Sequence, residues 1–421
     1  MAAAVVLTGL AAGVVGTGLT LVLHLVQHVA FGYTENTFLV GVERASPARR
    51  LVALAAGGLL VGAGWWGRRR WVDNEAVSVT HALREPRPRL PVLATLSDAL
   101  LQIVAVGTGA SMGREGAPRQ GAAAIAGWIA ERLAVDARAQ RRLLACGAGA
   151  GLAAVYNVPL GGAAFTLEVL LGSLALADVA AAIAASALAT VVAWPLLGDR
   201  PTYPIPTVHL DAPVLVWSLL LAPIVGVTGV LFSRVMTRAR THAPTGWRAF
   251  PATVVVFIAL GALASAYPEL LGNGKGMTGL AFDGVLGLGT AGVLVLLKPL
   301  ATALCLGGGA IGGLLTPALA TGAAAGIFVG RLWSMLWPGA APVEYAMVAA
   351  AALLAVTMRA PITAVLLVLE FTHTGTALLL PMLACVAGAT VTARRVEQRR
   401  ASRPRPLAAR SRSMPARPPS P

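Results

Sequence analysis

The chain has 421 residues, of which 57% are hydrophobic and only 12% are charged, and it contains 47 glycines. A soluble protein carries about 25% charged residues, so this composition excludes an ordinary soluble globular domain. The net charge of +15 does not indicate a nucleic-acid partner, because the arginines cluster beside apolar segments and in the C-terminal tail. That placement is typical of the cytosolic ends of membrane helices.

Apolar segments recur along the chain with the length of about 20 residues that a helix needs to cross a bilayer. We therefore predict an all-α, polytopic membrane protein. The first segment, 2–31, has no basic start and no cleavage site, which predicts a retained membrane helix rather than a signal peptide. The other predicted apolar segments cover residues 51–66, 90–106, 143–171, 175–197, 214–235, 250–266, 286–306 and 375–391.

The C-terminal residues 394–421 combine arginines with proline, serine and alanine and show no apolar periodicity. They predict a basic, disordered cytosolic tail, attracted to anionic lipid by about 1 kcal/mol per basic residue. We place the protein in the cell membrane with this tail in the cytosol, and we predict no nucleic-acid partner. Cys146, Cys305 and Cys385 have no CxxC spacing, and we predict neither a metal site nor a cofactor.

Residues 107–120, GTGASMGREGAPRQ, place Arg114 and Glu115 inside an otherwise apolar segment. A charge at the centre of a membrane helix costs about 2.5–3.5 kcal/mol, so this pair is expected to face a polar path rather than lipid. An acid in a low-dielectric path competes with a permeating anion and links proton occupancy to anion occupancy. The alternative interpretation is that Glu115 only forms a structural ion pair with Arg114.

Residues 307–326, GGGAIGGLLTPALATGAAAG, repeat the glycine-rich start and the Gly-x-x-x-x-Pro spacing of the first motif. Each motif is followed by a proline, Pro159 or Pro361, and then at the same offset by a Leu-Glu pair ending at Glu168 or Glu370. This pattern predicts a transmembrane domain, 1–393, with two inverted-topology repeats at about 48–197 and 214–393, whose broken helices meet near the midplane. Helix N-termini attract anions, so an anion is the expected ligand.

The GREG stretch followed by Gln120 resembles the GREGP…Q signature of the CLC family of chloride channels and proton/chloride exchangers. GGLLTP at 312–317 resembles the GGxFxP motif of that family, and NVPLGGAAFTLE and APITAVLLVLEFT are similar to its helices. The resemblance covers about 91–391. It implies a homodimer in membrane lipid with one pathway per subunit for chloride or a similar monovalent anion.

The resemblance also implies roles for individual residues. Glu115 matches the gating glutamate, whose ionised carboxylate sits in the anion path and whose protonated form swings out. The backbone N–H groups of Leu314 and Leu315 are expected to point at the central anion. The expected anion-binding residues are Arg114, Gly116, Gly313, Leu314, Leu315 and Asn74.

Four of the departures from the family pattern bear directly on transport. The serine motif is missing, and the matching stretch puts Asn74 in the place of the serine; either Asn74 rebuilds the anion site or the loop no longer touches the ion. The tyrosine expected after the last span is also missing, with Ser402 near its place. Arg119 stands where the family usually has an apolar residue; either it raises the local anion concentration or it points away.

The fourth departure is Val169, which follows Glu168 where proton-coupled exchangers commonly carry a second acid. Valine cannot titrate, which favours channel-like or weakly proton-coupled conduction, although a relay by a different residue or by water stays open. The alternatives are a proton-coupled chloride or fluoride antiporter and a non-conducting relative. An intramembrane enzyme would need a nucleophile with a base, and the apolar segments contain no Ser/His or Cys/His pair, so we predict no enzyme.

Overall fold

A computed structural model describes residues 1–35, 37–71 and 77–401 of the chain. Within these residues the regular structure is helical, apart from an isolated antiparallel bridge between Gly113 and Gly313. Eight of the described helices are long and apolar enough to cross a membrane. The all-α, polytopic prediction is confirmed.

The helices fall into two halves. The first holds α1 (Ala2–Phe31), α2 (Phe38–Arg44), α3 (Pro47–Trp71), α4 (Val79–Ala82), α5 (Val92–Gly107), α6 (Gly116–Arg132), α7 (Ala137–Tyr156), α8 (Pro159–Phe165), a π-helical turn (Thr166–Leu171) and α9 (Leu176–Leu197). The second holds α10 (Ala212–Thr241), 3-10 turns at Gly246–Arg248 and Pro268–Leu270, α11 (Ala249–Ala266), α12 (Lys275–Phe282), α13 (Leu288–Gly307), α14 (Leu315–Ser334), α15 (Pro342–Met358), α16 (Pro361–Thr372) and α17 (Leu379–Ala401).

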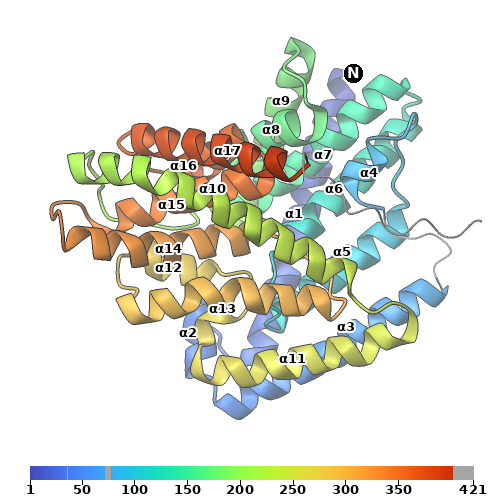
Figure 1. Cartoon of the computed structure of the whole chain (residues 1–421). Helices are drawn as coiled ribbons and strands as arrows, with labels where there is room; N and C mark the ends of the chain where they lie inside the picture. The colour runs from blue at the N-terminus through green and yellow to red at the C-terminus, as the bar shows by residue number, and fades with distance from the viewer. Residues whose placement is uncertain (36, 72–76, 402–421) are drawn as a thin grey trace, which may run out of the picture.

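Helix packing follows the same plan in both halves. In the first, α1 packs against α7 and α9, and α6 packs against α7; in the second, α10 packs against α15 and α17, and α14 packs against α15. The long helices α3 and α11 lie against one another and join the halves (Figure 1). By the order of helices, α1 of the first half corresponds to α10 of the second. The repeat limits of about 48–197 and 214–393 stay predictions.

Small residues allow the central helices to approach closely at the corresponding interfaces of the two halves, α6 with α7 and α14 with α15. A Cβ added to Gly151 of α7 would lie 2.4 Å from the carbonyl oxygen of Pro118 in α6. A Cβ added to Gly326 of α14 would lie 2.3 Å from the carbonyl oxygen of Tyr345 in α15. Between membrane helices this backbone contact supplies the packing that hydrophobic burial supplies in water.

The breaks between helices also match, and their local sequence explains them. Asn157 follows the end of α7 and Arg359 follows the end of α15, both in the left-handed conformation with φ of 57° and 55°. Pro159 and Pro361 then open α8 and α16 at their first residue. A left-handed residue ends a helix, and proline suits the first turn because its missing N–H has no intrahelical partner there.

Contacts between the halves are reciprocal. Glu370 of α16 accepts hydrogen bonds from the N–H groups of Leu160 and Gly161 at the start of α8, at 2.9 and 2.6 Å. In return, Glu168 accepts from the N–H groups of Ile362 and Thr363 at the start of α16, at 3.2 and 2.7 Å. Such an exchange is what a two-fold relation between the repeats produces.

Two segments differ from the sequence predictions. The charged stretch 136–142, which precedes the predicted apolar segment 143–171 and indicates a connection by its charge, is instead the start of α7, because the Asp136 carboxylate accepts the Ala139 N–H at 2.7 Å and caps the helix. Residues 394–401 are not a disordered tail but the end of α17, where Glu397 pairs with Arg359 at 2.7 Å. The rest of the predicted tail, 402–421, lies outside the described residues.

Candidate functional site

Glu115 lies where the two halves meet, at the start of α6, with its side chain fully buried. Its carboxylate crosses to the other half of the chain. The N–H of Leu315, the first residue of α14, donates to Oε1 at 2.7 Å, and the Thr316 hydroxyl donates to Oε2 at 3.2 Å. The carboxylate therefore sits at the positive end of a 20-residue helix.

Gly113 and Gly313 make room for this carboxylate. Their backbones exchange N–H···O hydrogen bonds of 2.8 and 2.9 Å, which fix the two broken segments side by side. A Cβ on Gly113 would lie 2.2 Å from Oε2 of Glu115, and a Cβ on Gly313 would lie 2.0 Å from Oε1. A side chain at either position would collide with the carboxylate and displace it.

A cavity of about 620 Å³, which we call the vestibule, leads to this point. Glu115, Gly116, Gly313, Leu314 and Leu315 all line it, so the structure brings together five of the seven predicted gating and anion-binding residues. The wall also contains polar side chains that were not predicted as site residues: Arg68, Ser78, Thr80, Asp98, Gln102 and Arg240.

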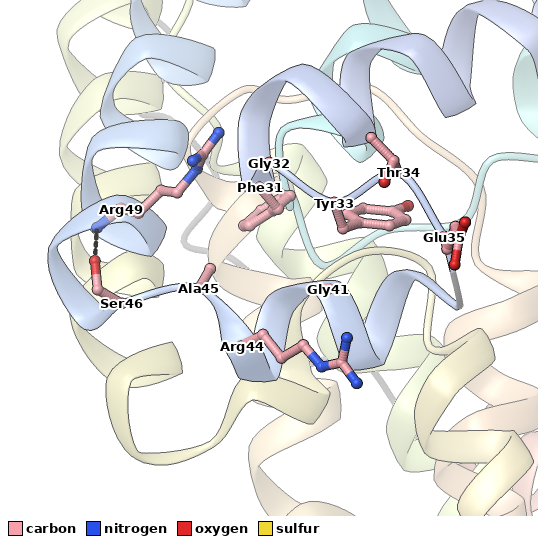
Figure 2. Close-up of a pocket in the computed structure, with 10 residues that line it drawn as sticks. All are labelled: Phe31, Gly32, Tyr33, Thr34, Glu35, Gly41, Arg44, Ala45, Ser46 and Arg49. Carbon is pink, nitrogen blue, oxygen red and sulfur yellow. Dashed lines mark hydrogen bonds between the residues drawn. The ribbon is translucent and has the colours of Figure 1, made fainter.

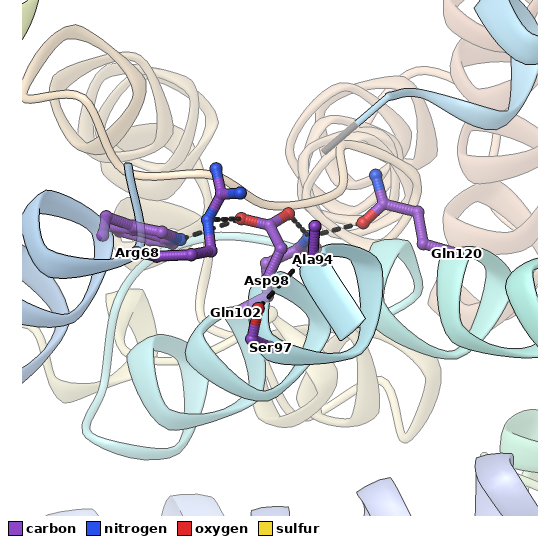
Figure 3. Close-up of polar contacts among 7 residues, drawn as sticks. Arg68, Ala94, Ser97, Asp98, Gln102 and Gln120 are labelled. Atoms are coloured by element: carbon purple, nitrogen blue, oxygen red, sulfur yellow. Dashed lines mark hydrogen bonds and ion pairs between the residues drawn. The ribbon is translucent and has the colours of Figure 1, made fainter. Parts of the chain in front are cut away.

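A polar network on α5 forms one side of the vestibule (Figure 3). Asp98 accepts from the Trp65 indole N–H at 3.0 Å and from Gln102 Nε2 at 2.9 Å, and the Arg68 guanidinium lies 3.9 Å away. Gln102 also donates to Gln120 Oε1 at 2.8 Å. Asp98 and Gln102 stand four residues apart in an apolar segment, and that spacing of polar residues could have revealed the network from the sequence.

Arg114 is not part of the vestibule lining, although it is the neighbour of Glu115. Its guanidinium donates to the carbonyl oxygen of Val155 at 3.2 Å and lies 4.8 Å over the Tyr156 ring. The five ion pairs found among the described residues do not include one between Arg114 and Glu115. The geometry thus separates Arg114 from the other predicted anion-binding residues.

Val169 lines a smaller cavity of about 200 Å³, which we call the side chamber. Ser78, Thr80, Arg119, Gln120 and Met358 line both cavities, so the side chamber adjoins the vestibule. Glu168 lines neither cavity. The predicted roles of Asn74 and Ser402 concern residues that lie outside the described part of the chain.

Residues 57–394 match the family model described as "Voltage gated chloride channel". The chain belongs to this CLC family. A putative chloride channel protein, ClcB-like, from Ralstonia nicotianae is 33% identical over 374 residues, which cover 83% of this chain and 84% of that protein. The voltage-gated ClC-type chloride channel ClcB from Citrobacter koseri is 31% identical over 82% of this chain and 85% of that protein.

Solved CLC structures share the fold. A slow cyanobacterial Cl⁻/H⁺ antiporter superposes with a TM-score of 0.82 at 23% identity and 94% coverage of both chains. A CLC-type fluoride/proton antiporter superposes with a TM-score of 0.70 at 20% identity, over 92% of this chain and 93% of that one. This chain is therefore a multi-pass membrane protein with CLC architecture.

Within this CLC fold, Asp98 and Lys298 occupy equivalent places, since the bridged glycines Gly113 and Gly313 stand at the same distance after each. Asp98 lines the vestibule. Lys298 is fully buried, and its Nζ donates to the Ser111 hydroxyl at 2.9 Å and to the carbonyls of Leu270 and Gly272 at 3.0 Å each. In the first repeat the residue at this position thus lines the cavity. In the second repeat it binds the loops beside the Gly113–Gly313 bridge.

A separate hollow of about 460 Å³ lies between the end of α1, α2 and the start of α3 (Figure 2). Arg49 closes the end of α1 there by donating to the carbonyls of Ala30 and Val29 at 3.0 Å each. α3 has 25 residues and spans about 37 Å, so this hollow and Arg68 lie at opposite ends of it. The described site residues of the CLC motifs do not line this hollow.

Proposed function

We propose that this CLC protein moves chloride or a similar monovalent anion across the cell membrane between α6 and α14, and that Glu115 gates the pathway. The observation that carries the proposal is the hydrogen bond from the Leu315 N–H to the Glu115 carboxylate. A helix N-terminus is a ready site for an anion because its N–H groups and its dipole both favour negative charge. The ionised side chain occupies that site and competes with the permeating anion.

Protonation of Glu115 removes the charge that holds it at α14. The neutral side chain is attracted less strongly to the N-terminus of α14, and an anion takes its place. Anion flux is therefore expected to rise as the pH falls. The glycines at 113 and 313 leave space that the carboxylate fills, so its departure opens the path without a shift of the backbone.

The vestibule is proposed to face the cytosol. Arg68 and Arg240 line it, and Arg359, next to the vestibule residue Met358, pairs with Glu397 near the end of α17. The C-terminal end of α17 is thus on the vestibule side, and clustered arginines favour the cytosolic side. This orientation agrees with a cytosolic C-terminal tail.

Channel-like or weakly proton-coupled conduction is the form of transport that Val169 supports. Its side chain lines the side chamber and carries no proton that could titrate.

Family members are transporters. We propose that this chain has no enzymatic activity, binds no metal or cofactor and has no nucleic-acid partner. We further propose that the chain forms a homodimer in membrane lipid. Single-molecule photobleaching in liposomes tests this, because it counts the subunits in each complex.

Proton-coupled exchange of chloride or fluoride is the second candidate, and Asp98 is the observation that favours it. Its carboxylate lines the same cavity as Glu115. Gln102, which donates to Asp98 at 2.9 Å, also lies against Gly116, where a Cβ would be 2.5 Å from its Oε1. An acid placed in this way can pass protons toward the gate through water.

The test is simultaneous recording of chloride efflux and proton uptake from liposomes that contain the purified full chain, over a range of pH. We expect chloride efflux that rises toward low pH without matched proton uptake. Glu115→Gln is expected to show the low-pH flux of the wild type at every pH. Glu131→Gln, which changes an exposed ion pair with Arg89, is the matched control and is expected to behave as wild type.

Other outcomes separate the alternatives. Matched proton uptake that Asp98→Asn abolishes would establish the exchanger and its relay. The same assay with fluoride and nitrate tests selectivity. If the wild type moves none of these anions, the transport proposal is wrong and a non-conducting relative is favoured.

A further inference from the structure

Arg119 is a cation in the vestibule wall for which the CLC resemblance offers no role. It lies one turn after Glu115 in α6, on the same face of the helix. Its side chain lines both the vestibule and the side chamber. Of the two open interpretations of this residue, the structure thus favours the one in which it faces the anion path.

The guanidinium of Arg119 contacts an aromatic ring, and the nearby acid, Glu115, acts on it through its charge and not through an ion pair within 4 Å. Its central carbon lies 5.0 Å from the ring centroid of Phe165, at the end of α8. Within residues 1–35, 37–71 and 77–401, its side chain makes no hydrogen bond or ion pair. This contact with the ring face holds the guanidinium in place and leaves its N–H groups free to donate.

The other charged groups of the vestibule already have partners. Asp98 lies 3.9 Å from Arg68, Glu115 accepts from Leu315, and Arg240 donates to the Gly312 carbonyl at 3.5 Å. Arg119 is therefore the vestibule arginine whose donors are uncommitted among the described residues. The negative charge that acts on Arg119 is that of Glu115, whose carboxylate is hydrogen-bonded to the start of α14. An anion that enters the cavity can therefore accept hydrogen bonds from the free N–H groups of this partly buried cation.

We propose that Arg119 is a side-chain ligand for the transported anion, and that it favours planar oxyanions such as nitrate over spherical halides. This inference rests on the proposed anion transport. The guanidinium edge presents two parallel N–H donors, which match two oxygens of a trigonal oxyanion, whereas chloride offers a single centre. Arg119 thus supplies a side-chain ligand in a chain that lacks the family's serine motif.

The experiment compares Arg119→Leu, Arg119→Lys and Arg132→Leu in the full chain. Arg132 is a matched control, because it belongs to the same helix and also stacks on a ring, Trp128, at 5.0 Å, but it lines neither cavity. Calorimetry in detergent gives the Kd for chloride and for nitrate, and liposome flux gives the half-saturating concentration of each anion. Size-exclusion profiles show whether each variant folds.

We expect Arg119→Leu to weaken nitrate binding at least tenfold and chloride binding less, with Arg132→Leu unchanged. Arg119→Lys keeps the positive charge but lacks the two parallel N–H donors. Relative to Arg119→Leu, it should therefore restore chloride affinity but not nitrate affinity. Wild-type affinities in Arg119→Leu, or in Arg119→Lys if the leucine variant does not fold, would overturn the inference. Equal losses for both anions would overturn the oxyanion preference.

The two proposals fail separately. If the wild type binds anions in detergent but conducts none in liposomes, the transport proposal fails and calorimetry still decides the role of Arg119. If the wild type conducts and Arg119→Leu conducts with unchanged half-saturation, the transport proposal stands and the role of Arg119 is refuted.

Discussion

Glu115 and the pair Glu168 and Glu370 accept hydrogen bonds from the same kind of donor, the first N–H groups of a helix in the opposite repeat. The pair is symmetric: each glutamate serves the helix of the other, and neither lines the vestibule or the side chamber. Glu115 has no such counterpart, because Leu315 stands at the equivalent position of the second repeat. Its carboxylate lies at a cavity wall and is fully buried.

This difference shows how one interaction serves two purposes. Where both repeats have a glutamate, as at Glu168 and Glu370, each carboxylate is bonded to the helix of the other repeat and the bonds join the halves. Where only one repeat keeps it, a single carboxylate occupies an anion site next to a cavity that can deliver a competitor. Loss of symmetry, rather than a new kind of contact, is what makes Glu115 a candidate gate.

Gly313→Ala is expected to give the largest effect. The new Cβ would lie 2.0 Å from Oε1 of Glu115, so the carboxylate must leave α14. Flux should become independent of pH, as in Glu115→Gln, and the free energy of unfolding should fall by about 1–3 kcal/mol from overpacking.

A double-mutant cycle sharpens this prediction. In a Glu115→Ala background, Gly313→Ala should cost much less stability, because the colliding atoms are gone. Gly289→Ala is the control, since a Cβ at Gly289 meets no atom within 4 Å. Equal costs of Gly313→Ala in both backgrounds would show that the collision is not with Glu115.

Glu168→Gln and Glu370→Gln are expected to act on stability alone. Each replaces a charged acceptor of two backbone N–H groups, which is worth about 1.5–3 kcal/mol. Thermal unfolding in detergent should show similar losses for the two variants, while the pH dependence of flux stays that of the wild type. A change of that pH dependence in either variant would remove the distinction between the pair and Glu115.

Glu397→Gln is expected to have the smallest effect. The pair with Arg359 is short, at 2.7 Å, but the two side chains are 41% and 77% exposed. Exposed ion pairs contribute about 0.2–1 kcal/mol because water screens them. A loss as large as that of Glu370→Gln would mean that α17 depends on this pair more than its exposure indicates.

Much of the fold was predictable because membrane helices are selected by local composition. Local sequence is enough to recognise the apolar segments, the repeated motifs and the helix starts at Pro159 and Pro361, because each depends on residues that are near one another in the chain. The limits of segments were less predictable. α17 continues to Ala401, and its Glu397 pairs with Arg359 of a different segment, while α7 begins at 137 because Asp136 caps a charged stretch.

The sequence by itself determined the class of the protein and its internal repetition, and it singled out Glu115 as a candidate site residue, since a charge in an apolar segment indicates a site wherever that segment lies. Only the tertiary structure decided which residues share that site. Arg114 and Glu115 are neighbours in the chain yet contact different partners, and Asp98, Arg119 and Arg240 meet in one cavity. The reason is that the site is made by contacts between residues about 200 positions apart, which no local pattern encodes.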